Sequence, residues 1–447
     1  MTFALVLYGV AVLAVGLGTA RAASRSRDAY LVGDRSFGPG VTWAALSSTT
    51  IGGSTTLVLA ALVAQVGLPG LWLDLAGALG LAALGLFLAR TVRETGAVTI
   101  SEVIGRFYGP RVRRVAAFLV VLAEIVWFAL LAEATMTVLV AATPWSPTPV
   151  LVATAAVFIA YTLLGGQRAV VRTDVLQFGL MAAGLLGVAL PLAAASLAKT
   201  GAPGALLAFP LSPRFGFLDA VALLVLVGLP HAVGSDVWSK LLSARDAGVA
   251  RRAALGAAAS KVAFGLSTAT IALAGVGLGL GVPPAELFPK TVVALAGPAL
   301  APFLLVAMIA TMQSSSDSVL LSASAATVHD LLPRRFATPG WGRVFVAVWG
   351  AAGLAVALLL RDLIETFRLG YTLFASGLIL PTLAAFVPSV RVAPAAAAAA
   401  MLAGGAAALV ERFTRVAGVD PVLVGTAVNA AILVAGLRRR ERDGGRR

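Results

Sequence analysis

The sequence predicts an all-α protein that crosses a membrane many times, and three observations support this fold class. Apolar residues make up 59% of the 447 residues, whereas charged residues make up only 12%. A soluble domain averages about 45–50% apolar and about 25% charged residues. The mean hydropathy is +0.95, and the apolar residues form long runs without the alternation of a membrane β-strand. Helices satisfy their own backbone hydrogen bonds in lipid, which favours a helical bundle.

Thirteen apolar runs approach or exceed the roughly 20 residues that a membrane span requires. They cover approximately residues 2–20, 41–64, 70–90, 115–141, 147–164, 173–197, 218–232, 253–281, 294–328, 342–360, 369–387, 393–411 and 419–437. With thirteen spans, alternate loops and the C-terminal tail hold far more arginine and lysine than the opposite loops. Since basic loops remain cytoplasmic, we expect a multi-pass plasma-membrane protein with its N-terminus outside and its C-terminus in the cytoplasm.

Composition also excludes several classes of protein. The net charge of +14 comes from short arginine clusters between spans, so we expect a lipid bilayer rather than nucleic acid as the partner. The chain has no cysteine and only two histidines, which excludes disulfides and thiolate metal sites. The glycine-rich residues 275–279 lie inside a span and follow no strand, so they are not a nucleotide loop. No catalytic pair is evident, and we expect neither an enzyme nor a resident cofactor.

Hydroxyl side chains gather on one helix within the span at 294–328. Helical periodicity places a group of side chains on about one face: Thr311, Ser314, Ser315, Asp317 and Ser318. Oxygen ligands suit hard cations. Serine and threonine also bond across packed membrane helices, but five polar residues on one face exceed what packing needs. This strip therefore predicts an ion site.

Two spans contain sequences that disfavour a continuous helix. Residues 47–56 combine two glycines with eight residues that are mostly serine and threonine, and residues 228–231 read Gly-Leu-Pro-His. Both patterns weaken a helix. Broken helices expose backbone carbonyls that bind cations. Because the two breaks lie five spans apart, their positions suggest an inverted repeat of five plus five helices.

Charged residues within spans are costly and are often functional. The sequence places six there: Glu124, Glu133, Asp174, Asp236, Lys261 and Asp317. Asp174 and Asp236 lie near the cytoplasmic ends of their spans, where the cost is lower. For Glu124, Glu133 and Lys261 we expect pairing, neutralisation or, for the lysine, snorkelling.

Five stretches resemble the sodium:solute symporter family: residues 27–38, 48–53, 99–109, 161–177 and 314–330. The stretch 161–177 is the most specific, whereas the last hundred residues match only in hydropathy. The resemblance implies a leucine-transporter-type core of ten helices at 41–387. It also implies an extra helix and cytoplasmic loop at 1–40, and two further helices with a basic tail at 388–447.

The resemblance further implies a sodium site between the first and eighth core helices. Its ligands would be the carbonyls of Ser48, Ile51 and Thr311 and the hydroxyls of Ser314 and Ser315. Serine at 48 and threonine at 311 depart from the small residues of the family, and ligation by a carbonyl tolerates both.

The resemblance also implies a role for three further polar residues and a place for the solute. Asp174 matches a carboxylate on the inner ion path, and Asp317 with Ser318 occupies the place of a second ion. The expected solute region holds four candidate side chains, none of which the sequence singles out: Thr55, Gln65, Trp72 and His231.

The sequence therefore predicts a secondary transporter that couples uptake of a small organic solute to sodium by alternating access, with Na⁺ as the coupling ion. A proton-coupled carrier that uses Asp174 or Asp317 is one alternative. A membrane sensor with a symporter-like fold is another, although only ten residues follow the last span, so we expect no output domain. No obligate protein partner is implied.

Overall fold

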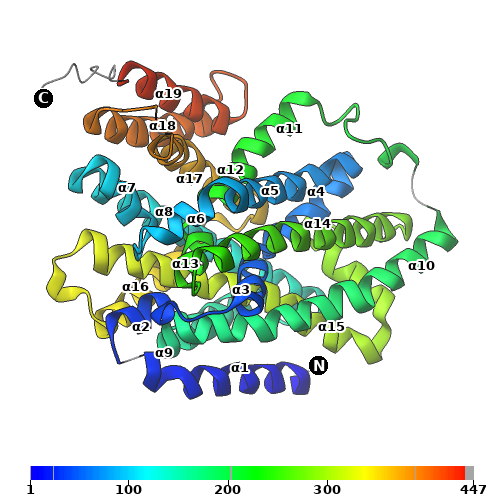
Figure 1. Cartoon of the computed structure of the whole chain (residues 1–447). Coiled ribbons are helices and arrows are strands. Elements are labelled where there is room, and N and C mark those ends of the chain that lie inside the picture. Colours follow the sequence, from blue (N-terminus) through cyan, green and yellow to red (C-terminus); the bar gives the residue numbers. More distant parts are fainter. Residues whose placement is uncertain (1, 24, 202–203, 388, 438–447) are drawn as a thin grey trace, which may run out of the picture.

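A computed structural model describes residues 2–23, 25–201, 204–387 and 389–437 (Figure 1). Within these ranges every named element is helical. The helices are α1 Thr2–Ala23, α2 Arg27–Val32, α3 Pro39–Thr50, α4 Leu59–Val66, α5 Trp72–Ala83, α6 Ala89–Glu94, α7 Ile100–Tyr108, α8 Pro110–Ala142, α9 Pro147–Met181, α10 Leu190–Thr200, α11 Phe217–Leu223, α12 Leu229–Val233, α13 Ser235–Ser243, α14 Ala247–Gly277, α15 Pro284–Ala326, α16 Pro339–Leu360, α17 Leu363–Ala385, α18 Pro394–Thr414 and α19 Pro421–Ala435. The predicted basic tail at 438–447 lies outside the described residues.

Several helices begin as their sequences predict. Proline occupies the first turn of α3, α8 and α9, where its missing N–H costs no intrahelical hydrogen bond. Asp246 precedes α14 and accepts a hydrogen bond from the Val249 N–H at 2.8 Å. Such capping satisfies backbone donors that the first turn leaves without partners.

Nine helical segments of the described chain are long and apolar enough to span a membrane, or ten if the bent pair α3–α4 forms one span. The predicted number of thirteen is not confirmed, although each predicted range falls on helix. Two of those ranges lie in one segment of 54 residues, Pro147–Thr200. A straight helix of that length would measure about 80 Å, against a hydrocarbon core of about 30 Å. The segment instead turns at Gly166, whose φ of 54° suits glycine.

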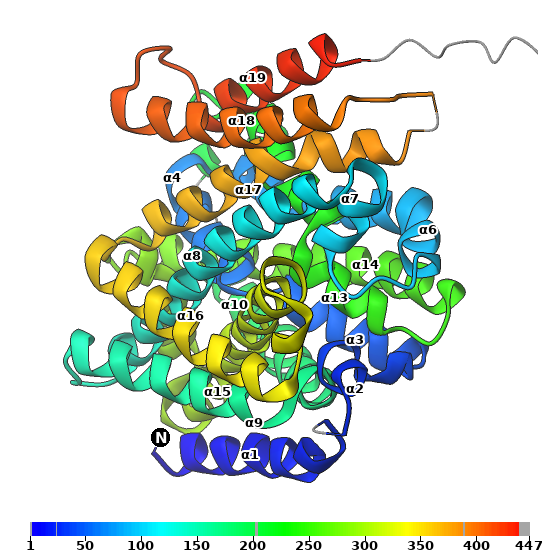
Figure 2. The same cartoon turned by 90° about the vertical axis from the view of Figure 1, so that its left-hand side faces the viewer.

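The bundle has two peripheral sides (Figures 1 and 2). Helix α1 packs along α9 at one side, and α18 and α19 pack on α17 at the opposite side. Helices α3, α8, α14 and α15 lie between them, with α15 packed against each of the other three and α14 packed against α3. Nearly half of the buried polar side chains of the described residues belong to these four helices, with the largest share on α15, so much of the polar chemistry lies in the interior of the bundle.

The predicted break in the second span is present. Helix α3 ends at Thr50, and the chain resumes with a π-helical turn at Ser54–Val58 that continues into α4. The segment Ser54–Val66 is bent by 56° from α3. The second break lies further along than residues 228–231. Pro230 is accommodated at the start of α12 because a π-helical turn, Leu224–Gly228, precedes it. The chain becomes extended only at Gly234, between α12 and α13.

Candidate ion and solute site

The break in α3 exposes backbone next to a helix rich in hydroxyls. Ile51 closes α3 with φ −109° and ψ 72°, which is no longer helical. Four polar residues precede it and all are buried: Ser47, Ser48, Thr49 and Thr50. A buried carbonyl at a helix end needs a partner, so this end of α3 requires hydroxyls or a cation from a neighbouring element.

Helix α15 supplies those hydroxyls. The Ser314 Oγ donates to the Ser48 carbonyl at 3.0 Å, and the Ser315 Oγ donates to the Thr49 carbonyl at 2.8 Å. Both hydroxyls also lie within reach of the Thr311 carbonyl, at 3.1 and 3.3 Å. The structure thus brings four of the five predicted sodium-site residues together, with Ile51 at the adjoining helix end. It adds Thr49, which the sequence analysis did not include.

A glycine allows the two helices to approach. A Cβ at position 52 would lie 2.7 Å from the Ser315 Oγ and 3.3 Å from Leu131. Any larger residue would therefore displace the Ser315 hydroxyl from the break. This contact gives a physical reason for the glycine pair in the middle of the second predicted span.

The other predicted ion residues divide between two places. Ser318 faces α3, where its Oγ lies 3.2 Å from the Thr49 hydroxyl. Asp317 turns instead toward α9, where Thr162 donates to one carboxylate oxygen at 3.4 Å. Asp317 therefore does not share the face of the serine strip, because one step along a helix rotates a side chain by about 100°.

Asp174 forms a buried ion pair that the sequence analysis did not predict. The Lys240 Nζ lies 2.6 Å from the Asp174 Oδ2, and neither side chain is exposed. Lys240 lies on α13, inside the bundle. Helix α13 follows the predicted span 218–232 and packs against α3 and α15, which buries Lys240.

A second buried ion pair joins Asp74 of α5 to Lys261 of α14, with Nζ and Oδ1 3.1 Å apart and both side chains unexposed. Asp74 lies within the predicted span 70–90 but is not among the six charges named above. Lys261 is therefore paired rather than snorkelling. Glu124 accepts a hydrogen bond from Ser235, whereas both carboxylate oxygens of Glu133 lack a hydrogen-bond partner among the described groups.

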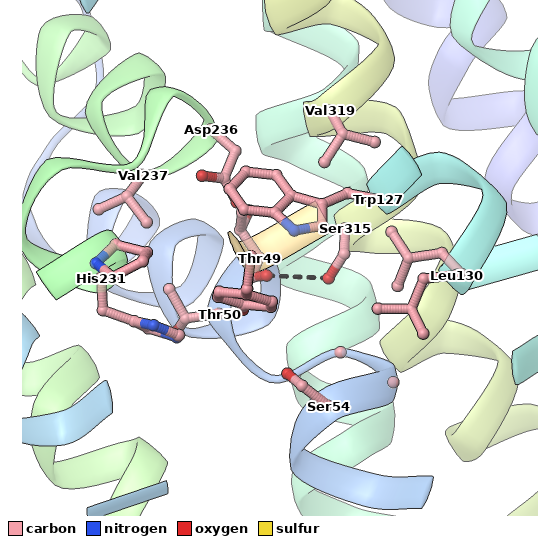
Figure 3. A pocket seen from close by; sticks show the side chains of 15 residues that line it. Thr49, Thr50, Ser54, Trp127, Leu130, His231, Asp236, Val237, Ser315 and Val319 are labelled. Carbon is pink, nitrogen blue, oxygen red and sulfur yellow. Dashed lines mark hydrogen bonds between the residues drawn. The ribbon is translucent and has the colours of Figure 1, made fainter. Parts of the chain in front are cut away.

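A central cavity lies against the break in α3 (Figure 3). Polar lining comes from α3, α13 and α15, including Thr49, Asp236 and Ser315. Rings line it too, with Trp127 of α8 lying 5.2 Å from Tyr371 of α17 between ring centroids. Because Ser315 borders the cavity and also meets the broken helix, a solute here would lie beside the candidate ion site.

Only one of the four candidate solute residues lines this cavity. His231 does so, and its ring stacks with that of Tyr371 at 6.4 Å. Thr55 follows the break and does not line the cavity; its hydroxyl donates to the Asp74 carboxylate of α5 at 3.1 Å. Trp72 stacks on a loop residue, Phe209, and exposed Gln65 lines two cavities near the helix ends.

The sequence analysis missed Trp127, Tyr371 and Asp236 as cavity residues. Asp236 had been noted only as a charge within a span. A rare acidic residue just after Gly234 was a usable signal, because irregular backbone inside a membrane lines cavities. Nothing in the sequence distinguished the two rings from ordinary packing.

One strongly perturbed carboxyl lies outside the candidate spans, on α7. Burial alone would raise the pKa of Glu102. Three hydrogen bonds to its carboxylate lower the pKa and together outweigh burial: one from His329 at 2.8 Å, one from the Val98 N–H and one from Arg106. The pKa of Glu102 therefore lies well below its usual value. This network ties α7 to the end of α15 through His329.

The fold is shared with known ion-coupled transporters. A Na⁺-coupled sialic acid symporter in a substrate-bound, outward-open state matches with a TM-score of 0.80 and 17% identity, over 98% of both chains. Mhp1, a nucleobase-cation-symport-1 family transporter in a closed conformation, matches with a TM-score of 0.62 and 15% identity, over 91% of this chain and 93% of that one. The chain is therefore a multi-pass protein with the leucine-transporter type of fold.

Residues 30–203 match the model of the sodium:solute symporter family. The high-affinity choline transporter 1 of Torpedo marmorata is 27% identical over 399 residues, which cover 80% of this chain and 68% of that protein. The family resemblance that the sequence motifs indicate is thus confirmed. The most specific motif, 161–177, lies within the matched residues, whereas the hydroxyl-rich stretch 314–330 lies beyond them.

Proposed function

We propose that this protein is a secondary transporter, not an enzyme, that carries a small organic cation together with sodium by alternating access. One observation supports this most directly. The Ser314 and Ser315 hydroxyls of α15 converge on the Ser48 and Thr49 carbonyls at the break of α3. Carbonyl and hydroxyl oxygens from two helices are a ligand set for a hard cation.

In this proposal sodium binds between the carbonyls of Ser48, Ile51 and Thr311 and the two serine hydroxyls. Each hydroxyl can donate its proton to the Thr311 carbonyl, at 3.1 Å for Ser314 and 3.3 Å for Ser315, and keep a lone pair for the ion. The ion would join α3 to α15 and so favour conformations in which these helices touch. A ligand shifts an equilibrium only by its difference in affinity for the two states.

Coupling follows from shared residues. Thr49 and Ser315 line the central cavity and also meet each other at the break (Figure 3). An ion that orders these residues pre-forms one wall of the cavity, so solute binding then costs less. The coupling is reciprocal, since a bound solute must raise the affinity for the ion by the same factor.

The lining of the cavity favours an organic cation as the solute. Trp127 and Tyr371 line the cavity with aromatic rings, and the faces of such rings attract quaternary ammonium groups. Asp236 is the carboxylate among the residues that line the cavity. The choline transporter of Torpedo marmorata, a relative of this chain, supports the same class of solute.

We further propose the arrangement of the parts. The core of ten helices, in two inverted sets of five, would occupy 41–387. Helix α1 and the pair α18–α19 flank opposite sides of the bundle, which suits additions to such a core (Figure 2). The distribution of basic residues supports an N-terminus outside and a C-terminus in the cytoplasm.

Uptake into proteoliposomes tests the proposal. The purified protein would be reconstituted, and radiolabelled choline, proline and glucose would be offered under an inward sodium gradient, a potassium gradient or a proton gradient. We expect choline uptake that requires sodium and is increased by an inside-negative membrane potential. Uptake driven by a proton gradient alone would favour proton coupling through Asp174 or Asp317. Solute binding without any uptake would favour a sensor.

A further inference from the structure

A positively charged side chain of the protein itself lies at the break of α3, on the α14 side. The Lys261 ammonium of α14 donates to the Thr50 carbonyl at 2.8 Å and to the Thr55 hydroxyl at 2.8 Å. It also pairs with the Asp74 carboxylate at 3.1 Å, and neither side chain of that pair is exposed. Thr50 and Thr55 lie on either side of the break, so one ammonium group joins both halves of the broken helix.

The surrounding helices are shaped around this pair. A Cβ at Gly77 of α5 would lie 2.3 Å from the Lys261 Cε, and a Cβ at Gly265 of α14 would lie 2.9 Å from the Asp74 carboxylate. Both distances are too short for any side chain, so two glycines leave the space that the ion pair occupies.

The groups around the ammonium are those that bind alkali metal ions. They are a backbone carbonyl, a hydroxyl and a carboxylate, and the Asp74 Oδ2 has no hydrogen-bond partner among the described groups. A lysine ammonium carries the same charge as sodium but is tethered to its helix. Removing one partner of a buried ion pair is costly because it leaves the other charge uncompensated.

We propose that Thr50, Thr55 and Asp74 form a monovalent cation site that the Lys261 ammonium permanently occupies. The broken helix is then held by one exchangeable ion on the α15 side and one fixed charge on the α14 side. This inference rests on the proposed function only for the exchangeable ion, and it limits the exchangeable cations at this break to one.

Removal of the ammonium group should therefore open the site to sodium. A ligand that binds only the folded state stabilises it by a logarithmic term, so the slope of stability against the logarithm of sodium concentration counts the ions bound. The slope would be measured by thermal unfolding in detergent, with N-methyl-D-glucamine chloride holding ionic strength constant. We expect Lys261→Ala to bind one more sodium ion than the wild type.

Two further variants make the result specific. In Lys261→Ala/Asp74→Asn the carboxylate is gone, so we expect the slope to return to that of the wild type. In Lys261→Ala/Ser315→Ala the site at α15 is weakened, and we expect the additional sodium to remain. If the proposed function is wrong, the wild type will have no sodium slope, yet Lys261→Ala will still gain one ion.

Three outcomes would overturn the proposal. The first is a folded Lys261→Ala protein with the slope of the wild type, and the second is an additional ion that persists without the Asp74 carboxylate. The third is a Lys261→Ala protein that is not monodisperse even in saturating sodium, because sodium would then not replace the ammonium. An additional stabilisation by potassium equal to that by sodium would instead support a monovalent site without selectivity.

Discussion

The hydroxyl of Ser315 offers the sharpest test of the candidate sodium site. It donates to the Thr49 carbonyl at 2.8 Å and lies 3.3 Å from the Thr311 carbonyl. In Ser315→Ala the broken helix loses one partner on α15, and a bound ion loses one oxygen ligand. The carbonyls around the site are left in place, so the change removes a single interaction.

The size of the effect follows from the charge of the ion. An interaction between a neutral polar group and a charged partner is worth about 1.5–3 kcal/mol, and every 1.4 kcal/mol changes a dissociation constant tenfold. We therefore expect the sodium affinity of Ser315→Ala to fall by about 10- to 150-fold. Without sodium, loss of a neutral hydrogen bond should cost only about 0.5–1.5 kcal/mol of stability.

Thermal unfolding across a sodium titration measures both quantities. The midpoint of the sodium-dependent shift gives the affinity, and the unfolding temperature without sodium gives the intrinsic stability. Ser316→Ala is a matched control, because Ser316 is also buried but its hydroxyl donates to the Met312 carbonyl of its own helix at 2.9 Å. It should leave the sodium midpoint unchanged.

A third variant tests the same site without removing a ligand. In Gly52→Ala the new methyl group would crowd the Ser315 Oγ, 2.7 Å away, so sodium affinity should again fall. An unchanged sodium midpoint in Ser315→Ala, or an equal loss in Ser316→Ala, would refute the assignment of the site.

Three further predictions concern other parts of the bundle. Lys240→Met should destabilise the protein by about 3–5 kcal/mol, because it leaves the buried Asp174 carboxylate uncompensated; chemical unfolding measures this, and equal stability of the variant would contradict it. Trp127→Ala should weaken binding of choline in the central cavity by about 2 kcal/mol, or roughly 30-fold, because it removes a cation–π contact. Isothermal titration calorimetry measures this affinity, and an unchanged value would contradict the prediction. Glu102→Gln should remove stability that the wild type has above pH 4.5, the ordinary pKa of the carboxyl, and loses as pH falls through the depressed value. The two proteins should therefore differ most near neutral pH and converge in acid, and parallel unfolding curves at every pH would exclude this role of the His329 contact.

Local sequence was sufficient to indicate most residues of the candidate ion site. Two glycines and a run of hydroxyl residues predicted the break in α3, since both weaken a helix without help from any distant residue. The serines at 314 and 315 stood out because hydroxyls are concentrated in an otherwise apolar span. The structure places both beside the break, although that they bind sodium remains a prediction.

Where sequence reasoning erred, the cause was tertiary in each case. The break near Pro230 was placed too early, because a preceding π-helical turn accommodates the proline and Gly234 forms the irregular backbone. Asp317 was assigned to the serine face, but it turns toward Thr162 on a neighbouring helix. Periodicity gives angles within one helix, yet it does not say which neighbour each angle faces.

The sequence by itself determined that the chain is a multi-span helical protein with a broken second span and a hydroxyl-rich span at 294–328. Apolarity and helix breaking are properties of consecutive residues, so they can be predicted from the sequence alone. Only the tertiary structure decided that Asp74 meets Lys261 and that Asp174 meets Lys240. Each pair joins residues far apart in the chain, and a buried charge is tolerated only where the packing of several helices brings its partner within about 3 Å.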